Sequence, residues 1–197
     1  MHNLGKTTDI DEPAGTYSRA ILNRLLIDLS WASSHLEGNT YSRLDTRELI
    51  EHGKAARGKG AIETQMILNH KTAIELLVEN IDSAEFNRYT LMNLHSALAE
   101  NLLPNPADEG RIRQHAVDIS KSIYRPLSTA QQIEEVLDEV LSKANQIHDP
   151  FEQSFFMMVH LPYLQPFADI NKRTSRLAAN LPLFRGNLCP LTFLDVP

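Results

Sequence analysis

Residues 128–156 read STAQQIEEVLDEVLSKANQIHDPFEQSFF, and the apolar side chains after the first five residues recur at helical spacing. The recurring positions are Ile133, Val136, Leu137, Val140, Leu141, Ala144 and Ile147. Residues three and four apart share one face of an α-helix, so this segment predicts an amphipathic helix with that face toward a core. Ser128 followed by Gln131 predicts a capping box at its start. Asp149 followed by Pro150 predicts the N-cap and first turn of the next helix.

The same spacing continues on both sides of this stretch. Further helices are expected over residues 17–36, 62–81 and 87–102, and a last one from Asn171 that Pro182 bends or ends, with Gly186 as its furthest limit. The chain is therefore predicted to be mainly helical.

Residues 103–127 interrupt the helical pattern. Pro104, Pro106 and Gly110 break a helix, and the apolar residues that follow are too irregularly spaced for a helical face. A short β-hairpin or extended flap fits this segment best. The sequence thus predicts an all-α domain with a small β-hairpin flap.

The composition narrows the classes of protein that are possible. The chain has 197 residues, of which 42% are hydrophobic and 22% charged, as in an ordinary globular domain. No apolar run approaches the roughly 18 residues of a membrane span, so no membrane partner is expected. The single cysteine, Cys189, excludes an internal disulfide and favours the cytoplasm. A net charge of −6 argues against a broad nucleic-acid-binding surface.

The residues with the most chemistry lie in HLPYLQPFADINKRTSR, residues 160–176. Pro162 and Pro166 are expected to end one helix, and Asn171 to open the next. Backbone N–H groups at a helix start attract anions, and a carboxylate beside phosphate-binding cations can hold Mg²⁺ against a nucleotide. The carboxylate is that of Asp169, and the cations are Lys172, Arg173 and Arg176. The alternative is an ordinary surface loop in which Asp169 pairs with Arg173.

Residues 166–176 resemble the signature loop of the Fic (Fido) family, whose usual form is H-P-F-x-[DE]-G-N-G-R-x-x-R. The resemblance implies a loop between two helices that binds ATP with Mg²⁺ and transfers AMP to a hydroxyl group of a target protein. It implies that Asp169 is the Mg²⁺ ligand and that Asn171 holds the loop and touches the nucleotide. The expected nucleotide-binding residues are Asn171, Lys172, Arg173 as the phosphate clamp, and Arg176 at the γ-phosphate.

A second motif, SSHLEGN at residues 33–39, resembles the family's inhibitory motif, [ST]-x-x-x-E-[GN], in the class that carries it N-terminal to the core. The matching positions are Ser33, Glu37 and Gly38. The resemblance implies that Glu37 pairs with Arg176 and blocks the γ-phosphate position. It also divides the chain into an N-terminal helical segment with the inhibitory motif, residues 1–60, and a Fic-like core, residues 61–197.

A third motif resembles the flap on which Fic proteins hold the target segment by strand addition. Its residues are Gly110, Arg111, Ile112 and Arg113, followed by residues 117–124. The resemblance implies ATP and a docked target protein as partners, and a homo-oligomer is also possible.

Departures from the family pattern decide what activity to expect. Gln165 stands where the family has its catalytic histidine, and an amide cannot accept a proton from a hydroxyl group. His160 lies at least one helical turn away and is a poor substitute. Ile170 and Lys172 replace two glycines, which predicts a phosphate loop that binds less well. The triplet from Asn171 to Arg173 resembles the N-K-R of Doc toxins, a branch that transfers phosphate instead.

Three functions therefore stay open from the sequence. The first, which the residues favour most, is an ATP–Mg²⁺-binding protein whose AMP transfer is weak or absent. The second is an active nucleotidyl- or Doc-like phosphotransferase that uses a substitute base. The third is a non-catalytic module that docks a partner protein.

Overall fold

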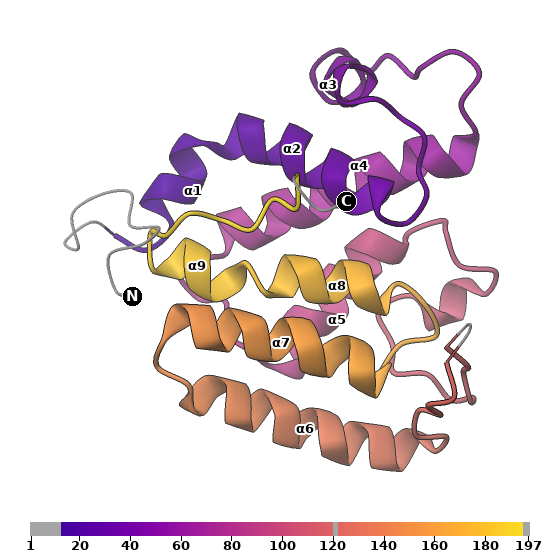
Figure 1. Ribbon diagram of the computed structural model, residues 1–197, viewed down its shortest axis with the longest axis vertical. Coiled ribbons are helices and arrows are strands. Elements are labelled where there is room, and N and C mark those ends of the chain that lie inside the picture. Colours follow the sequence, from indigo (N-terminus) through magenta and orange to yellow (C-terminus); the bar gives the residue numbers. More distant parts are fainter. Residues whose placement is uncertain (1–12, 120–121, 195–197) are drawn as a thin grey trace. The chain divides into compact units, whose positions relative to one another are not determined.

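The computed structural model describes residues 13–119 and 122–194. Within these ranges it contains helices but no β-strand (Figure 1). The helices are α1 (Thr16–Ala20), α2 (Leu22–His35), α3 (Arg43–His52), α4 (Ala61–Glu79), α5 (Arg88–Ala99), the 3₁₀ turn η1 (Pro106–Asp108), α6 (Ala130–Gln146), α7 (Pro150–Leu164), α8 (Asn171–Ala178) and α9 (Leu181–Arg185). Across these ranges, every helix is too short or too polar to cross a membrane.

The chain forms two compact units. The first consists of residues 1–83 and 183–197, and the second of residues 84–182. Each unit has its own buried apolar side chains, so each is described separately below.

In the first unit α2 packs against α3 and α4. Leu25 and Leu29 of α2 and Ile67 and Ile74 of α4 are almost fully buried. The single helix expected over residues 17–36 is interrupted at Ile21, which leaves the helical region with φ −105° and ψ 13°. A new hydrogen-bond ladder starts there, since the N–H of Leu25 donates to the carbonyl of Ile21.

Helix α3 of the first unit was not expected from apolar spacing, because only Thr46 and Leu49 of its residues are buried. The sequence nevertheless contains a signal for the start of this helix. The hydroxyl of Ser42 accepts the N–H of Asp45, and the carboxylate of Asp45 accepts the N–H of Ser42, which is a capping box. Gly53 ends the helix in the left-handed region, with φ 69°.

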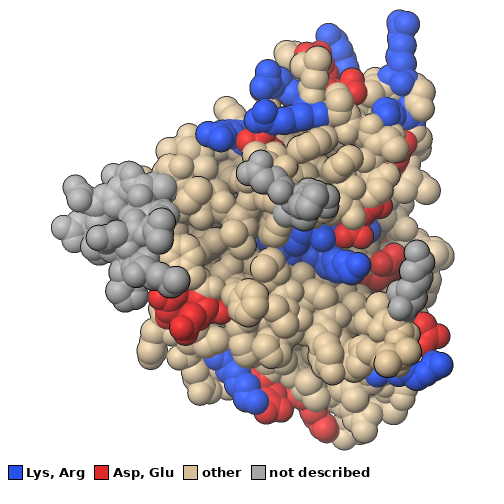
Figure 2. Space-filling model, viewed as in Figure 1, with Lys and Arg blue, Asp and Glu red and all other residues tan. Residues whose placement is uncertain are grey.

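In the second unit α7 packs between α6 and α8, and α5 contacts α8 (Figure 1). Asp149 caps α7 as expected, because its carboxylate accepts the N–H groups of Phe151 and Glu152. The residues of α7 that face the core are Ser154, Met157, Leu161 and Leu164. Its larger apolar side chains, among them Phe151 and Phe155, are exposed, and Figure 2 shows a mostly uncharged surface over this helix.

Three predicted helix boundaries in this part of the chain are wrong. No capping box forms at Ser128, because α6 starts later and the hydroxyl of its N-cap Thr129 donates to Gln132. Pro162 does not end α7, which continues to Leu164; the proline lacks only its own N–H, and the last turn still closes because the N–H of Gln165 donates to the carbonyl of Leu161 at 3.0 Å. Pro182 lies in the first turn of α9, where a proline N–H would have no partner anyway.

The β-hairpin expected between residues 103 and 127 is not seen in the described part of that segment, which leaves out residues 120 and 121. The described residues between η1 and the start of α6 lie in no helix or strand. The side chain of Arg113 provides a physical reason. Its guanidinium donates to the carbonyl oxygens of His115 and Leu127, so a side chain and not a facing strand satisfies these two acceptors.

Candidate functional site

The loop between α7 and α8, residues 165–170, begins and ends with a left-handed backbone. Gln165 has φ 51° and ψ 58°, and Ile170 has φ 63° and ψ 9°. A β-branched residue in this region costs about 1–3 kcal/mol. Ile170 is also buried, with 3% of its surface exposed, so packing of its side chain offsets that cost. The loop thus keeps the backbone shape that a glycine would allow, although the residue is isoleucine.

The side chain of Asn171 closes the loop from the first turn of α8. Its oxygen accepts the N–H of Phe167 at 3.0 Å, and its amide nitrogen donates to the Phe167 carbonyl at 3.0 Å. The same nitrogen donates to the side-chain oxygen of Gln165 at 2.9 Å. The Gln165 amide in turn donates to the carbonyl of Pro162 at 2.7 Å. Both polar atoms of the Gln165 side chain are therefore engaged in holding the loop.

Charged side chains surround the end of this loop. Asp169 is exposed, and its carboxylate accepts the N–H of Ile170 at 2.6 Å. Arg173 and Arg176 extend from α8 and are buried, with 7% and 9% of their surface exposed. Lys172 is exposed on the first turn. A surface pairing of Asp169 with Arg173 does not fit, because Arg173 is not a surface residue.

His95 on α5 is a site residue that the sequence analysis missed. Its imidazole is fully buried and stacks on the ring of Phe167, with 3.9 Å between the ring centres. The N–H of Gly110 donates to its Nδ1 at 2.9 Å, so the ring proton is on Nε2, which donates to the carbonyl of Asp169 at 3.2 Å. Burial lowers the pKa of His95 to about 4. A signal was present, because His95 lies three residues before Leu98 and four after Leu91 on the apolar face of its helix.

Arg113 joins the flap segment to the same loop. Its guanidinium is fully buried, and its Nε donates to the carbonyl of Gln165 at 2.7 Å. Its backbone N–H donates to the carbonyl of Pro166 at 3.0 Å. Burial lowers the pKa of the Arg113 guanidinium. Of the four residues expected to dock a target, Ile112 and Arg113 are buried, Gly110 packs on α5, and Arg111 is exposed.

The residues of the inhibitory motif lie in the first unit, at and just beyond the end of α2. Ser33 is buried and its hydroxyl lies 3.0 Å from Nε2 of His70 on α4. Glu37 is exposed in the turn that follows the helix, and Gly38 has φ 87°. Glu37 and Arg176 belong to different units, so their pairing stays a prediction.

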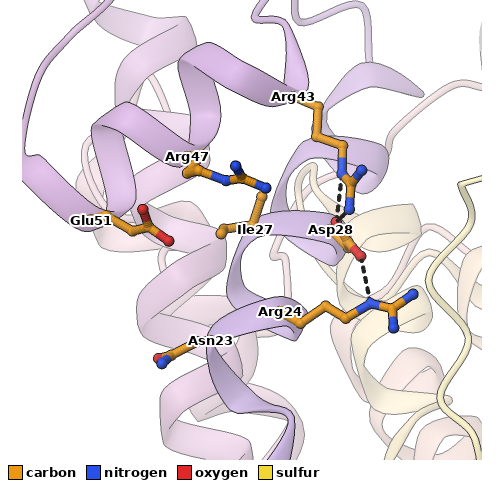
Figure 3. Close-up of a pocket in the computed structure, with 7 residues that line it drawn as sticks. All are labelled: Asn23, Arg24, Ile27, Asp28, Arg43, Arg47 and Glu51. Carbon is orange, nitrogen blue, oxygen red and sulfur yellow. Dashed lines mark hydrogen bonds and ion pairs between the residues drawn. The ribbon is translucent and has the colours of Figure 1, made fainter.

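A polar pocket of about 350 Å³ lies between α2 and α3 in the first unit (Figure 3). At its base the fully buried carboxylate of Asp28 accepts Nε of Arg43 at 2.7 Å and Nε of Arg24 at 3.2 Å. Arg47 and Glu51 of α3 also line it. The sequence analysis did not find this pocket, because the arginines that surround Asp28 come from two helices. The ion pair of Arg43 with Asp28 ties α3 to α2, whereas Arg24 and Asp28 both lie on α2.

The sequence model of the Fic/DOC family matches residues 85–183 of this chain. These residues contain the whole loop, α8 and the flap segment. The chain belongs to the Fic/DOC family. The match covers His95 and Arg113 as well as the signature loop, and so includes all the contacts of the second unit described above.

Similar Fic proteins are known from animals and bacteria. A protein adenylyltransferase of Caenorhabditis elegans, fic-1, is 27% identical over 162 residues, which cover 79% of this chain and 31% of that protein. The protein adenylyltransferase Fic of Nematostella vectensis is 28% identical over 164 residues, which cover 81% of this chain and 38% of that protein. The chain therefore spans about a third of the length of these relatives.

Solved Fic structures share the fold. A structure of fic-1 from Caenorhabditis elegans superposes with a TM-score of 0.70 at 23% identity, over 89% of this chain and 52% of that one. A Fic domain containing signaling protein from Bacteroides thetaiotaomicron gives a TM-score of 0.72 at 16% identity, over 89% of this chain and 68% of that one. The helical fold described here is thus the Fic fold.

Proposed function

We propose that this Fic protein binds ATP with Mg²⁺ and transfers AMP weakly or not at all. The observation that carries the proposal is the position of Gln165. Its amide stands where the family has its general base, and both of its polar atoms hold the loop. An amide has no accessible pKa, so it cannot take up a proton at neutral pH.

The residues present fit ATP and Mg²⁺. Mg²⁺ prefers a few carboxylate oxygens together with water and the phosphates of its substrate. Asp169 offers one exposed carboxylate, and the residues that the structure describes contain no cluster of three or more metal-binding side chains. The first-turn N–H groups of α8 have no acceptor inside the helix and point along a dipole that favours anions. Arg173 and Arg176 on that helix add positive charge for the phosphates.

The chemistry explains why the missing base matters. In the family reaction a hydroxyl oxygen of the target attacks the α-phosphorus of ATP, the bond to the β-phosphate breaks, and pyrophosphate leaves. The hydroxyl proton must go to a base near the attacking oxygen, and a positioned base contributes about 10²–10⁴-fold in rate. His160 is a poor replacement by position, because it lies on α7 five residues before Gln165, at least one helical turn back from the loop.

We further propose that the N-terminal segment regulates the site. In this proposal residues 1–60 carry the inhibitory motif, and Glu37 pairs with Arg176 of the core, residues 61–197, at the γ-phosphate position. A target protein docks on the exposed part of the flap segment. The only cysteine of the sequence, Cys189, is free, which is compatible with the cytoplasmic location expected from the sequence.

Calorimetry with ATP or ADP, with and without Mg²⁺, tests the binding proposal. We expect Mg²⁺-dependent binding that Arg173→Ala weakens about tenfold or more, because a charged hydrogen bond to phosphate contributes roughly 1.5–3 kcal/mol. Arg57→Ala, an exposed arginine of the first unit, is the matched control and leaves affinity unchanged. Absence of binding at millimolar nucleotide would refute the proposal.

Mass spectrometry after incubation with ATP and Mg²⁺ tests AMP transfer, for which we expect little or no mass gain of one AMP unit.

A further inference from the structure

We propose that His95 is a positioning residue that fixes the nucleotide loop at Asp169 and the start of the flap segment at Gly110 to one point on α5. The inference deepens the proposed function, because it concerns the loop that would bind ATP. All of the residues involved lie within the second unit.

The contact with Asp169 controls the peptide group that precedes Ile170. His95 Nε2–H donates to the carbonyl oxygen of Asp169 at 3.2 Å, and the carboxylate of Asp169 accepts the N–H of Ile170 at 2.6 Å. Both polar atoms of this one peptide group are therefore held. Fixing its plane keeps Ile170 in the left-handed conformation, which a β-branched residue does not favour by itself. His95 thus sets the backbone that leads into the first turn of α8.

The contact with Gly110 holds the start of the flap segment. The N–H of Gly110 donates to Nδ1 of His95 at 2.9 Å. A Cβ atom at this position would come within 2.9 Å of the Cβ of Ser96 and 3.1 Å of the carbonyl of Met92. Gly110 also has φ 68°, so two independent constraints require glycine where the chain crosses α5.

The two contacts demand one nitrogen that accepts and one that donates, within a flat ring that stacks on Phe167. Neutral imidazole provides all three properties. An aliphatic side chain would fill the space on the apolar face of α5, but it would leave the Gly110 N–H without this acceptor. A role limited to filling the core does not explain this arrangement.

Two conservative variants separate the two contacts. In His95→Asn the side-chain oxygen replaces Nδ1 and still accepts from Gly110, whereas nothing reaches the carbonyl of Asp169. In His95→Gln the terminal amide replaces Nε2 and still donates to Asp169, whereas Gly110 loses its acceptor. The measurements are hydrogen–deuterium exchange of peptides that cover residues 108–113 and 165–171, and the calorimetric affinity for ATP with Mg²⁺.

We expect opposite patterns from the two variants. His95→Asn exchanges faster in residues 165–171 and binds ATP about five- to tenfold more weakly, the ratio expected for one hydrogen bond. His95→Gln exchanges faster in residues 108–113 and binds ATP within twofold of the wild type. Leu91→Val, a buried change on the same helix, is the control for lost stability and leaves ATP affinity unchanged.

Each other outcome is decisive. If both variants change the two regions equally, or if neither changes them, His95 is only a core residue and the inference is overturned. If the wild-type protein binds no ATP, the proposed function fails. The exchange pattern then still decides whether His95 positions the two segments.

Discussion

Arg113 donates its Nε–H to the main-chain carbonyl of Gln165 over 2.7 Å, so a fully buried guanidinium holds the residue at which the family has its base. The same guanidinium donates to the carbonyl oxygens of His115 and Leu127, which lie on either side of residues 117–124 in the sequence. One side chain therefore joins two points of the chain that are 52 residues apart, at positions 113 and 165. Arg113 therefore links the flap segment to the loop between α7 and α8.

The first prediction concerns Arg113. Arg113→Ala removes a fully buried side chain and leaves three part-buried carbonyl oxygens without this donor, so we expect the free energy of unfolding to fall by about 3 kcal/mol or more. Urea unfolding followed by circular dichroism measures this change. Arg111→Ala is the control, since this exposed neighbour should shift stability by no more than about 0.5 kcal/mol. Equal effects of the two substitutions would contradict a structural role for Arg113.

The second prediction concerns the missing base. Gln165→His restores a group that can take up a proton at neutral pH, and we expect self-modification with ATP and Mg²⁺ to rise by about 10²–10⁴-fold. The increase should be larger together with Glu37→Gly. Incorporation of label from α-³²P-ATP measures it, and γ-³²P-ATP distinguishes phosphate transfer. If the double variant binds ATP but incorporates no more label than wild type, the histidine is not what limits the reaction.

The third prediction concerns Glu37. If its carboxylate occupies the γ-phosphate position, Glu37→Gly should tighten ATP binding and leave ADP and AMP binding nearly unchanged. Calorimetry with the three nucleotides gives the comparison. Glu51→Gly, a change of a glutamate on α3, is the control for lost negative charge in the first unit. An equal effect of Glu37→Gly on all three nucleotides would assign Glu37 a structural role only.

The fourth prediction separates strain from packing at Ile170. Removing a buried isoleucine side chain costs about 2–5 kcal/mol, whereas relief of its left-handed backbone returns about 1–3 kcal/mol. Packing therefore dominates, and Ile170→Gly should destabilise the protein. Ile170→Ala loses the side chain but keeps a Cβ at φ 63°, so it should be less stable than Ile170→Gly by about 1 kcal/mol. Thermal unfolding of the three proteins ranks them, and a more stable alanine variant would contradict a left-handed Ile170.

The fifth prediction is a pH dependence of stability. Burial, and to a lesser extent Arg173, lowers the pKa of His95 to about 4, against about 6.5 in an unfolded chain, while Asp169 and Asp108 partly oppose the change. Between pH 6.5 and 4 the unfolded chain binds a proton that the folded chain excludes. Acidification through this window should therefore remove about 3 kcal/mol of stability. Denaturant unfolding of wild type and His95→Gln at several pH values isolates this contribution, which the variant should lack.

The sequence predicted the helices whose starts and faces are determined by residues close together in the chain. The start of α7 follows from Asp149 and Pro150, and the amphipathic pattern of α6 from its apolar spacing. Helix α3 was missed because it buries few apolar residues, although its capping pair, Ser42 and Asp45, was readable. Apolar spacing finds helices that face a core and overlooks those that mainly face water.

The candidate loop residues were found because they are contiguous in the sequence. His95 was missed, and Arg113 was assigned only to the flap, because both lie more than 50 residues away from the loop and bind its main-chain atoms. A carbonyl oxygen has no sequence signature, so such contacts follow only from the fold. The hairpin expected in the flap is not seen among the described residues, where the side chain of Arg113, and not a facing strand, binds the carbonyl oxygens of His115 and Leu127.

The contacts of Asn171 with Phe167 have a consequence for how this domain can change. Asn171 binds both main-chain polar atoms of Phe167 without help from the side chain at position 165. Histidine tolerates the left-handed backbone of that position better than most residues do. The shape of the loop and the ability to transfer a group are therefore separable properties. A substitution at position 165 alone can therefore remove the base and leave the contacts that shape the loop in place.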